Sequence, residues 1–551
     1  MIKRVSPGVD TRYYDLFDKT ALPILLILIL VFILWPILEV LIKSFFPAGS
    51  LSLALYQDIY NNKSNLLFNS IFVATLSTFF TIIFALCISI YTLFTGTRAK
   101  KLISATLMLT MISPPFISAL AYITLFGKRG FITSTLLGLN MNPYDWHGIV
   151  LMQIASNVSI AALIIMGMMS GIDKRLIEAS LDLGESVTGT LKRVILPLAR
   201  PGIVAAAFIT FIKSIADFGT PLIIGGNFKM LASEAYLAVI GRGDFPMASA
   251  LSVIIIIPSI IAFFVYRSNM KHAELMAMSS SKSVQSSNLS FNLGVGLRAV
   301  LMLFTWTFLI FMTLQYVSIF MSAISDYRSG QLIFTSEYIQ EVSFSKMPSF
   351  FRSLYYAFIA AIATSVIGLL LSYYIERRRF KGAKSFDLIA SLPYIIPGPF
   401  FGIGYVLAFN DYPLALTGTG LIVVLNCVFR QIPISTKAAS ATLSNISTEL
   451  EDAARDLGAS NFRIIRGIIM PLLKPAFLVS FVNTFTATMT TVGAIIFLIT
   501  PSAKVATVEL FNVIREGKYG LAAVLACMII TATLLINVVF SRLLLRETKN
   551  G

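Results

Sequence analysis

The sequence predicts an all-α, polytopic membrane protein with about 12 transmembrane helices, arranged as two parallel six-helix repeats. Three observations support this prediction. Hydrophobic residues make up 56% of the 551 residues and charged residues only 13%, whereas charged residues are roughly a quarter of a soluble domain. Twelve apolar stretches reach the length of about 20 residues that a spanning helix needs. Segments of the first half of the chain also recur, in the same order, in the second half.

The predicted spans alternate with polar loops. Their limits are 21–43, 66–95, 102–126, 148–170, 201–224, 246–266, 297–322, 353–375, 387–408, 417–436, 475–499 and 520–541. No small-residue cleavage site follows the first span, so we expect a retained helix and not a signal peptide. Most of the 43 Lys and Arg residues fall at the two termini and in the even-numbered loops. The positive-inside rule therefore predicts that both termini are cytoplasmic.

The net charge of +16 does not indicate nucleic-acid binding, because the basic residues are spread over seven predicted cytoplasmic segments. We expect these residues to anchor the protein at the surface of the lipid bilayer. Cys87, Cys427 and Cys527 each stand alone in an apolar run and are expected to pack in the membrane. The two histidines fall in loops on opposite sides, so we expect no metal site.

A serine-rich segment, 276–292, lies at the middle of the chain and is typical of a flexible cytoplasmic linker. It separates a first half, 1–275, with spans 1–6, from a second half, 293–551, with spans 7–12. Residues 70–91 align with 353–374 at an offset of 283 positions. Because each half has an even number of spans, both copies enter the membrane with the same topology, as parallel repeats.

A charged, glycine-containing loop also occurs twice, at 173–201 and 447–475, with an offset of 274 positions. Its two copies share residues that set backbone shape: Gly184 and Gly458, Ser186 and Ser460, Pro197 and Pro471. The glycines are expected to end a short helix in the left-handed conformation, the serines to cap a second helix, and the prolines to stop that helix. An amphipathic loop resting on lipid headgroups is one interpretation. The glycine-to-proline spacing of 13 residues in both copies favours a duplicated protein partner instead.

This pattern resembles the EAA loop of the permease subunits of binding-protein-dependent ABC importers. Glu178, Ala179 and Gly184 match the motif in the first copy. In the second copy the acidic position is Asp452, with Glu451 just before it. The resemblance implies a type I ABC importer-like fold, whose two loops dock onto two copies of an ABC ATPase subunit. The residues so implied in coupling are Glu178, Ala179, Leu183, Gly184, Pro197, Asp452, Ala453, Ala454, Leu457, Gly458 and Pro471.

The chain contains no phosphate-binding loop of the form G-x-x-x-x-G-K-[ST]. We therefore expect that it is not an enzyme, that it holds no cofactor, and that ATP and Mg²⁺ bind to the separate ATPase. The resemblance further implies an extracytoplasmic substrate-binding protein and the bacterial inner membrane. The stretch "SIADFGTP" (214–221) looks most like the ferric-iron transport permeases, whereas "TVGAIIFLITP" (491–501) looks at least as much like the 2-aminoethylphosphonate branch. Ferric iron is the expected solute; 2-aminoethylphosphonate, hexose phosphate, thiamine and polyamines remain alternatives.

Polar residues inside the predicted spans are candidates for the translocation pathway, because ionisable groups are costly in the bilayer. Lys213 and Asp217 are spaced i, i+4, so they either pair with each other or line the pathway. In the second half, Asn483 and Thr491 bound a polar stretch. An ion-coupled secondary transporter is the alternative class, since it can share this architecture. It would use buried carboxylates, of which Asp217 is one candidate, and it would have no use for the duplicated loop.

Overall fold

The computed structural model describes residues 16–114, 116–128, 130–138, 142–277, 294–328, 331–378 and 380–550. This part of the chain is almost entirely helical, as predicted. The β structure within it is one antiparallel hairpin, β1 Ser325–Arg328 and β2 Gln331–Phe334, in which Ser325 pairs with Phe334. The predicted linker, 276–292, lies outside the described residues except for its first two positions. The chain divides into two compact units.

Unit 1 comprises the described residues within 1–46, 348–507 and 531–551. Its elements, including π-helical and 3-10 segments labelled η, are α1 Leu16–Ile29, η2 Leu30–Leu34, α2 Trp35–Phe45, α15 Met347–Tyr373, η5 Tyr374–Arg378, α16 Ala383–Ile395, α17 Gly398–Phe409, α18 Gly420–Leu443, α19 Glu449–Asp456, α20 Asn461–Ile464, η6 Ile465–Ile469, α21 Met470–Leu472, α22 Lys474–Thr490, η7 Pro501–Ala503 and the second part of α24 Tyr519–Asn550.

Unit 2 comprises the described residues within 47–347 and 508–530. Its elements are α3 Ala54–Leu93, α4 Thr97–Met111, α5 Phe116–Phe126, η3 Phe131–Leu136, α6 Trp146–Ser170, α7 Lys174–Asp182, α8 Val187–Thr190, η4 Leu191–Ile195, α9 Leu196–Ile215, α10 Gly219–Ile224, α11 Leu231–Arg242, α12 Phe245–Ala277, α13 Val295–Ile324, β1, β2, α14 Glu337–Ser345, most of α23 Ala506–Arg515 and the first part of α24.

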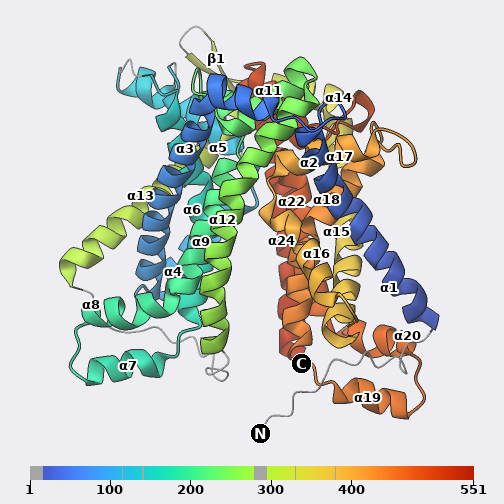
Figure 1. The fold of residues 1–551 in the computed structure, drawn as a ribbon. Coiled ribbons are helices and arrows are strands. Elements are labelled where there is room, and N and C mark those ends of the chain that lie inside the picture. Colours follow the sequence, from blue (N-terminus) through green and yellow to red (C-terminus); the bar gives the residue numbers. More distant parts are fainter. Residues whose placement is uncertain are drawn as a thin grey trace. The chain divides into compact units, whose positions relative to one another are not determined.

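The first helix of each sequence half packs with the other half. In unit 1, α2 lies against α17 (Figure 1). Just before α2, the Phe32 carbonyl of η2 accepts a hydrogen bond from the Tyr405 hydroxyl of α17 at 2.8 Å. In unit 2, α13 lies against α3 and α5, and the hydroxyls of Thr124 and Ser318 are 2.7 Å apart. The ranges 1–275 and 293–551 therefore divide the sequence, whereas the compact units exchange their first helices.

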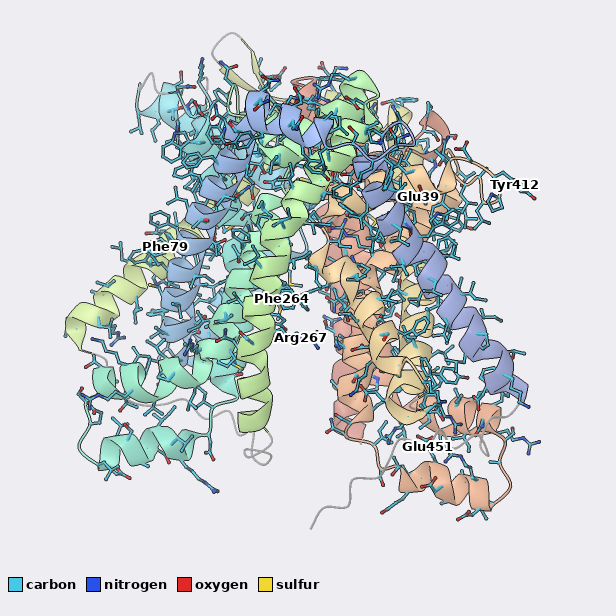
Figure 2. All side chains as sticks on the ribbon, viewed as in Figure 1. Glu39, Phe79, Phe264, Arg267, Tyr412 and Glu451 are labelled. Atoms are coloured by element: carbon cyan, nitrogen blue, oxygen red, sulfur yellow. The ribbon has the colours of Figure 1, made fainter. Side chains whose placement is uncertain are left out.

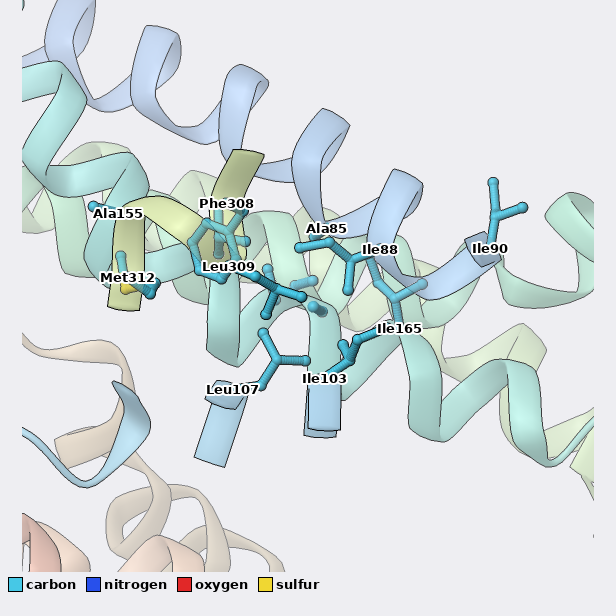
Figure 3. Close-up of a cluster of buried hydrophobic side chains, with 14 of the residues drawn as sticks. Ala85, Ile88, Ile90, Ile103, Leu107, Ala155, Ile165, Phe308, Leu309 and Met312 are labelled. Carbon is cyan, nitrogen blue, oxygen red and sulfur yellow. The ribbon is translucent and has the colours of Figure 1, made fainter. Parts of the chain in front are cut away.

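The core of unit 2 shows how α13 is held. Phe308, Leu309 and Met312 of α13 are buried in one apolar cluster with Ile88 of α3 and Ile103 of α4 (Figure 3). Burying a side chain of this size contributes about 1.5–3 kcal/mol relative to leaving it in water, although the gain is smaller when the reference is lipid, where packing contacts dominate. The cluster therefore joins a second-half helix to first-half helices through close packing.

The number of spans agrees with the prediction when bent helices are counted once. In the described chain, nine helices are long and apolar enough to cross a membrane, and three more pairs bend by 104°, 114° and 70° at short breaks. Pro114 stands in the break between α4 and α5, and Pro397 in that between α16 and α17. A proline removes a backbone donor and disfavours helix in the residue before it. These two breaks therefore occur at the prolines of the third and ninth predicted spans.

The fifth predicted span, 201–224, is wrong as a single helix. α9 ends at Ile215, and a separate short helix, α10, begins at Gly219. Asp217 lies between them and accepts a hydrogen bond from the Thr220 backbone N–H at 3.1 Å, which satisfies a donor in the first turn of α10. The sequence prediction treated 201–224 as one continuous span, and the structure has a full interruption.

Candidate functional site

The first copy of the repeated loop, hairpin 1, is formed by α7, α8 and η4. α7 begins after Asp173, whose carboxylate accepts from the Arg175 backbone N–H at 3.0 Å. The helix ends at Asp182, and Gly184 follows with a left-handed φ of +87°, which favours glycine. Ser186 then caps α8 by accepting from the Gly189 N–H at 3.0 Å. The predicted turn and cap are therefore confirmed.

The second copy, hairpin 2, repeats this geometry in α19, α20 and η6. Gly458 has a φ of +81°, and the Ala459 N–H donates to the Ala454 carbonyl at 3.0 Å, closing the end of α19. Ser460 accepts from the Arg463 N–H at a longer 3.5 Å. The shape is thus kept in both copies, with a weaker cap in the second.

The predicted stop of the second helix is wrong at Pro197, whereas in the second copy the helix ends at Leu472, one residue after Pro471. A π-helical segment precedes each proline, η4 at 191–195 and η6 at 465–469, and the helix continues past both. A π turn is wider than an α turn, which makes room for the proline ring and its missing N–H. In the first copy the helix continues to Ile215, whereas in the second it breaks at Leu473 and bends by 70°. Pro197 therefore marks a widened turn and not an end, whereas Pro471 stands one residue before the helix ends.

Each hairpin presents an apolar stripe to its surroundings. On α7 the stripe consists of Leu176, Ala179 and Leu183, and the aligned residues on α19 are Leu450, Ala453 and Leu457. Leu183 and Leu457 are both 88% exposed, and Leu176 and Leu450 are 50% and 48% exposed. The spacing i, i+3, i+7 places the three residues on one helix face. Sequence reasoning missed Leu176 and Leu450, although both are leucine at the same offset of 274 positions.

The exposed acids flank these stripes. Glu178 is exposed on α7. Its counterpart Asp452 is also exposed, with 66% of its side chain accessible, and forms an ion pair with Arg455 at 2.7 Å. The predicted acidic position of the second copy thus lies at the surface, where a partner could reach it.

Glu451, the neighbour of Asp452, is buried instead and fastens α19 to unit 1. Its side chain is 4% exposed and its carboxylate lies 3.4 Å from Arg377 Nε and 3.0 Å from Arg455 Nη2. Tyr373 donates a third contact from its hydroxyl at 3.0 Å. Figure 2 shows Glu451 at the end of unit 1 where α19 and α20 lie. Both hydrogen bonds fall on Oε2, whereas Oε1 has the ion pair with Arg377 but no hydrogen bond within the described chain. The buried charge is thus paired with two arginines.

We call the buried and partly buried residues that anchor hairpin 2 its seat: Glu451, Arg377, Arg455 and Tyr373. A second buried acid, Asp18 of α1, extends this seat. Its side chain is 0% exposed and lies 3.6 Å from Arg378 Nη2. It accepts hydrogen bonds from the Tyr374 hydroxyl at 2.9 Å and from Asn461 Nδ2 at 2.6 Å. Asn461 begins α20. The N-terminal helix is therefore bonded directly to hairpin 2.

Hairpin 1 has an apolar seat at the aligned positions. Glu451, Arg455 and Asn461 correspond to Ile177, Leu181 and Val187, and Tyr373 and Arg377 correspond to Ile90 and Phe94. All five apolar residues belong to the core of unit 2 or pack against it. Within hairpin 1, α7 and α8 are joined by the hydroxyls of Ser180 and Thr190, 2.9 Å apart. The two hairpins thus have the same shape, but hairpin 1 is held mainly by apolar packing and hairpin 2 by buried ion pairs and hydrogen bonds.

The predicted pathway residues lie apart from the hairpins. Lys213 is exposed on α9, and the Asp217 carboxylate accepts from Gln153 Nε2 at 3.2 Å as well as from the Thr220 N–H. Asn483 donates to the Val479 carbonyl of its own helix at 3.0 Å. Thr491 stands just after the last turn of α22, and its carbonyl accepts from Thr507 at 3.0 Å. The structure thus brings Asp217 into a polar cluster.

The chain is similar to known proteins over most of its length. Residues 77–274 and 365–546 each match the family model described as "Binding-protein-dependent transport system inner membrane component". The chain is 32% identical over 543 residues to the ferric transport system permease protein FbpB of Actinobacillus pleuropneumoniae, covering 96% of this chain and 78% of that protein. It is also 32% identical over 511 residues to a putative ferric transport system permease protein, FbpB 1, of Haemophilus influenzae, covering 89% and 79%.

A shorter similarity involves one half-length relative. The putative 2-aminoethylphosphonate transport system permease protein PhnV of Salmonella paratyphi A is 27% identical over 240 residues, covering 43% of this chain and 90% of that protein. The two family matches fall on the two predicted repeats, and each includes one hairpin. The chain is a fused, two-half member of the family of binding-protein-dependent transport system inner membrane components.

Proposed function

We propose that this chain is the permease of an ATP-driven importer that carries ferric iron, received from an extracytoplasmic substrate-binding protein, across the bacterial inner membrane. The observation that supports iron as the solute is the similarity to ferric transport permeases over 96% of the chain. A phosphonate is the second candidate, because a 2-aminoethylphosphonate permease matches 43% of the chain.

In this proposal, ATP hydrolysis is coupled to transport through the two hairpins. Two copies of a separate ABC ATPase each bind one hairpin, on the cytoplasmic side where both termini also lie. The duplicated apolar stripes support this arrangement, since Leu183 and Leu457 are both 88% exposed. Burying one leucine in a partner groove contributes about 1.5–3 kcal/mol. Glu178 and Asp452 add a charge beside each stripe that would orient the docked subunit.

The test is reconstitution of the permease with its ATPase and binding protein in vesicles. We expect ATP-dependent uptake of ferric iron, and the double variant Glu178→Ala/Asp452→Ala should hydrolyse ATP without matching uptake. The double variant Asp182→Ala/Asp456→Ala, which removes an exposed acid at the last residue of α7 and at the aligned last residue of α19, serves as the matched control. Normal uptake by the double variant would refute the role of the acids. Uptake of 2-aminoethylphosphonate in place of iron would select the second candidate.

The translocation pathway is proposed to include Lys213, Asp217, Asn483 and Thr491. Asp217 is held in a break between helices with its carboxylate hydrogen-bonded on two sides, a fixed arrangement suited to contacting a passing solute. Lys213→Met should lower uptake while leaving ATPase binding unchanged. Unaltered uptake by this variant would remove Lys213 from the pathway.

A further inference from the structure

Arg430 is a membrane-embedded cation that the proposed function does not yet use. It lies on α18, one of the nine candidate spans, and its side chain is partly buried. Its Nη1 is fully covered and has no hydrogen-bond acceptor among the described residues. None of the ion pairs found in the described chain involves Arg430. A charged side chain at this depth without a carboxylate partner is costly, and it usually marks a functional site.

Asn426 lies one helical turn before Arg430 and adds a second unsatisfied polar group. Its side chain is 0% exposed, and neither its amide nitrogen nor its amide oxygen has a hydrogen-bond partner in the described chain. Residues i and i+4 of a helix share a face. Buried amide groups without partners are rare, because each costs about 1–3 kcal/mol. One face of α18 therefore carries a cation and an amide that nothing in the described chain satisfies.

Gly398 lets the guanidinium of Arg430 lie against the beginning of α17. A Cβ at this position would be 2.6 Å from Nη1 and 2.8 Å from Nη2, closer than real atoms approach. α17 is a 12-residue helix that begins at Gly398, directly after the 114° break. The N-terminus of a helix carries a partial positive charge. Two positive groups thus meet where the described chain supplies no negative one.

The first half has no such imbalance at the aligned positions, which are Met152 and Ser156 of α6. The amide nitrogens nearby are used: Gln153 Nε2 donates to the Ser214 carbonyl and to Asp217, and Asn157 Nδ2 donates to the Ser214 hydroxyl at 3.3 Å. Gln153 Oε1 is buried without a partner in the described residues, but no cation stands at the aligned positions. The repeated fold therefore does not require a buried arginine here. The excess positive charge is a property of the second half alone.

We infer that Arg430, Asn426 and the beginning of α17 at Gly398 bind an oxyanion group of the transported solute. The planar guanidinium presents paired donors that match a carboxylate or phosphonate, and Asn426 supplies a further donor. This inference rests on the proposed function, because it assigns a contact to the solute in transit. The oxyanion comes either from the carboxylates of an anionic ferric chelate or from the phosphonate of an organophosphonate.

The test compares wild type with Arg430→Met in the purified permease–ATPase complex. Millimolar citrate and 2-aminoethylphosphonate are added separately, and the melting temperature is measured. An oxyanion that binds the folded state raises it. We expect one of the two anions to raise the melting temperature of wild type and not of the variant, and the anion that does so identifies the source. No shift in wild type with either anion, or an equal shift in the variant, would overturn the inference.

Two further variants separate binding from folding. Arg430→Met should be at least as stable as wild type without anion, because it removes a partly buried charge whose Nη1 has no acceptor in the described chain. Its KM for uptake should rise at least tenfold. Arg430→Lys keeps the charge without the paired donors, so its KM should lie between those of wild type and Arg430→Met. Gly398→Ala should mimic Arg430→Met by displacing the guanidinium. If wild type takes up neither solute, the proposed function fails, while the anion-dependent melting temperature still decides whether the oxyanion site exists.

Discussion

The buried contacts of Glu451 in the seat of hairpin 2 allow the free-energy cost of removing this carboxylate to be predicted. Glu451→Ala removes a carboxylate that is 4% exposed and that contacts Arg377, Arg455 and Tyr373. Removing one partner of a buried ion pair costs about 3–5 kcal/mol. Arg377 and Arg455 keep 12% and 20% of their side chains exposed and can regain water, so we expect the lower end, about 3 kcal/mol. At about 1.4 kcal/mol per tenfold change, α19 should open roughly 100-fold more often.

The assay is amide hydrogen exchange, which reports local opening of a helix. Peptides covering Glu449–Asp456 should exchange about 100-fold faster in Glu451→Ala than in wild type. Peptides covering α7 of hairpin 1 should not change, because its seat is apolar and contains no charge of this network.

The matched control is the adjacent acid. Asp452→Ala removes a side chain that is 66% exposed, and an exposed pair of this kind contributes only a few tenths of a kcal/mol. Exchange in α19 should therefore change less than about twofold. Wild-type exchange in Glu451→Ala, or equal acceleration by both variants, would refute the assignment of Glu451 as the buried anchor.

Three further predictions concern the turns and the N-terminal helix. Gly184→Ala and Gly458→Ala should each destabilise their hairpin by about 1–2 kcal/mol through left-handed strain alone, since a Cβ at either site meets nothing within 4 Å; an unchanged melting temperature and exchange rate would contradict this. Ser186→Ala should cost about 1 kcal/mol and Ser460→Ala less, because the cap distances are 3.0 and 3.5 Å; exchange in α8 and α20 measures the difference, and the reverse order would count against it. Asp18→Ala should accelerate exchange in both α1 and α20, because it breaks bonds to Arg378, Tyr374 and Asn461; an effect confined to α1 would show that the two are not linked.

The hairpin turns could be predicted because short-range chemistry encodes them. A glycine that accepts a left-handed φ and a serine two residues later determine the turn whatever surrounds it, and both copies show this at Gly184 and Gly458. The number of spans followed from hydropathy in the same way. Local chemistry also explains why the prolines were misread. Whether a helix breaks at Pro197 or widens into a π turn depends on packing around it, which the sequence does not display.

The buried anchor was missed for a different reason. Glu451 and Asp452 are adjacent acids, and only the rotation of α19 decides which one faces inward. That rotation depends on Arg377, more than 70 positions earlier in the chain. The motif drew attention to Asp452, and nothing local distinguished the two. The exchange of first helices was not predicted either, because the residues of an apolar helix do not by themselves specify which helix it will contact.

This exchange has a consequence for how the protein is made. α2 is synthesised early, yet its neighbour α17 begins only at Gly398. Roughly 350 residues must be added in between, which takes about 20–70 s at 5–20 residues per second. A membrane helix can persist alone for that time, because its backbone hydrogen bonds are internal. Asp18, however, gains the ion pair that the described residues show only once Arg378 is made. The bonds that tie α1 to Arg378 and to hairpin 2 are therefore completed only late in synthesis, so a partly translated chain holds one finished hairpin.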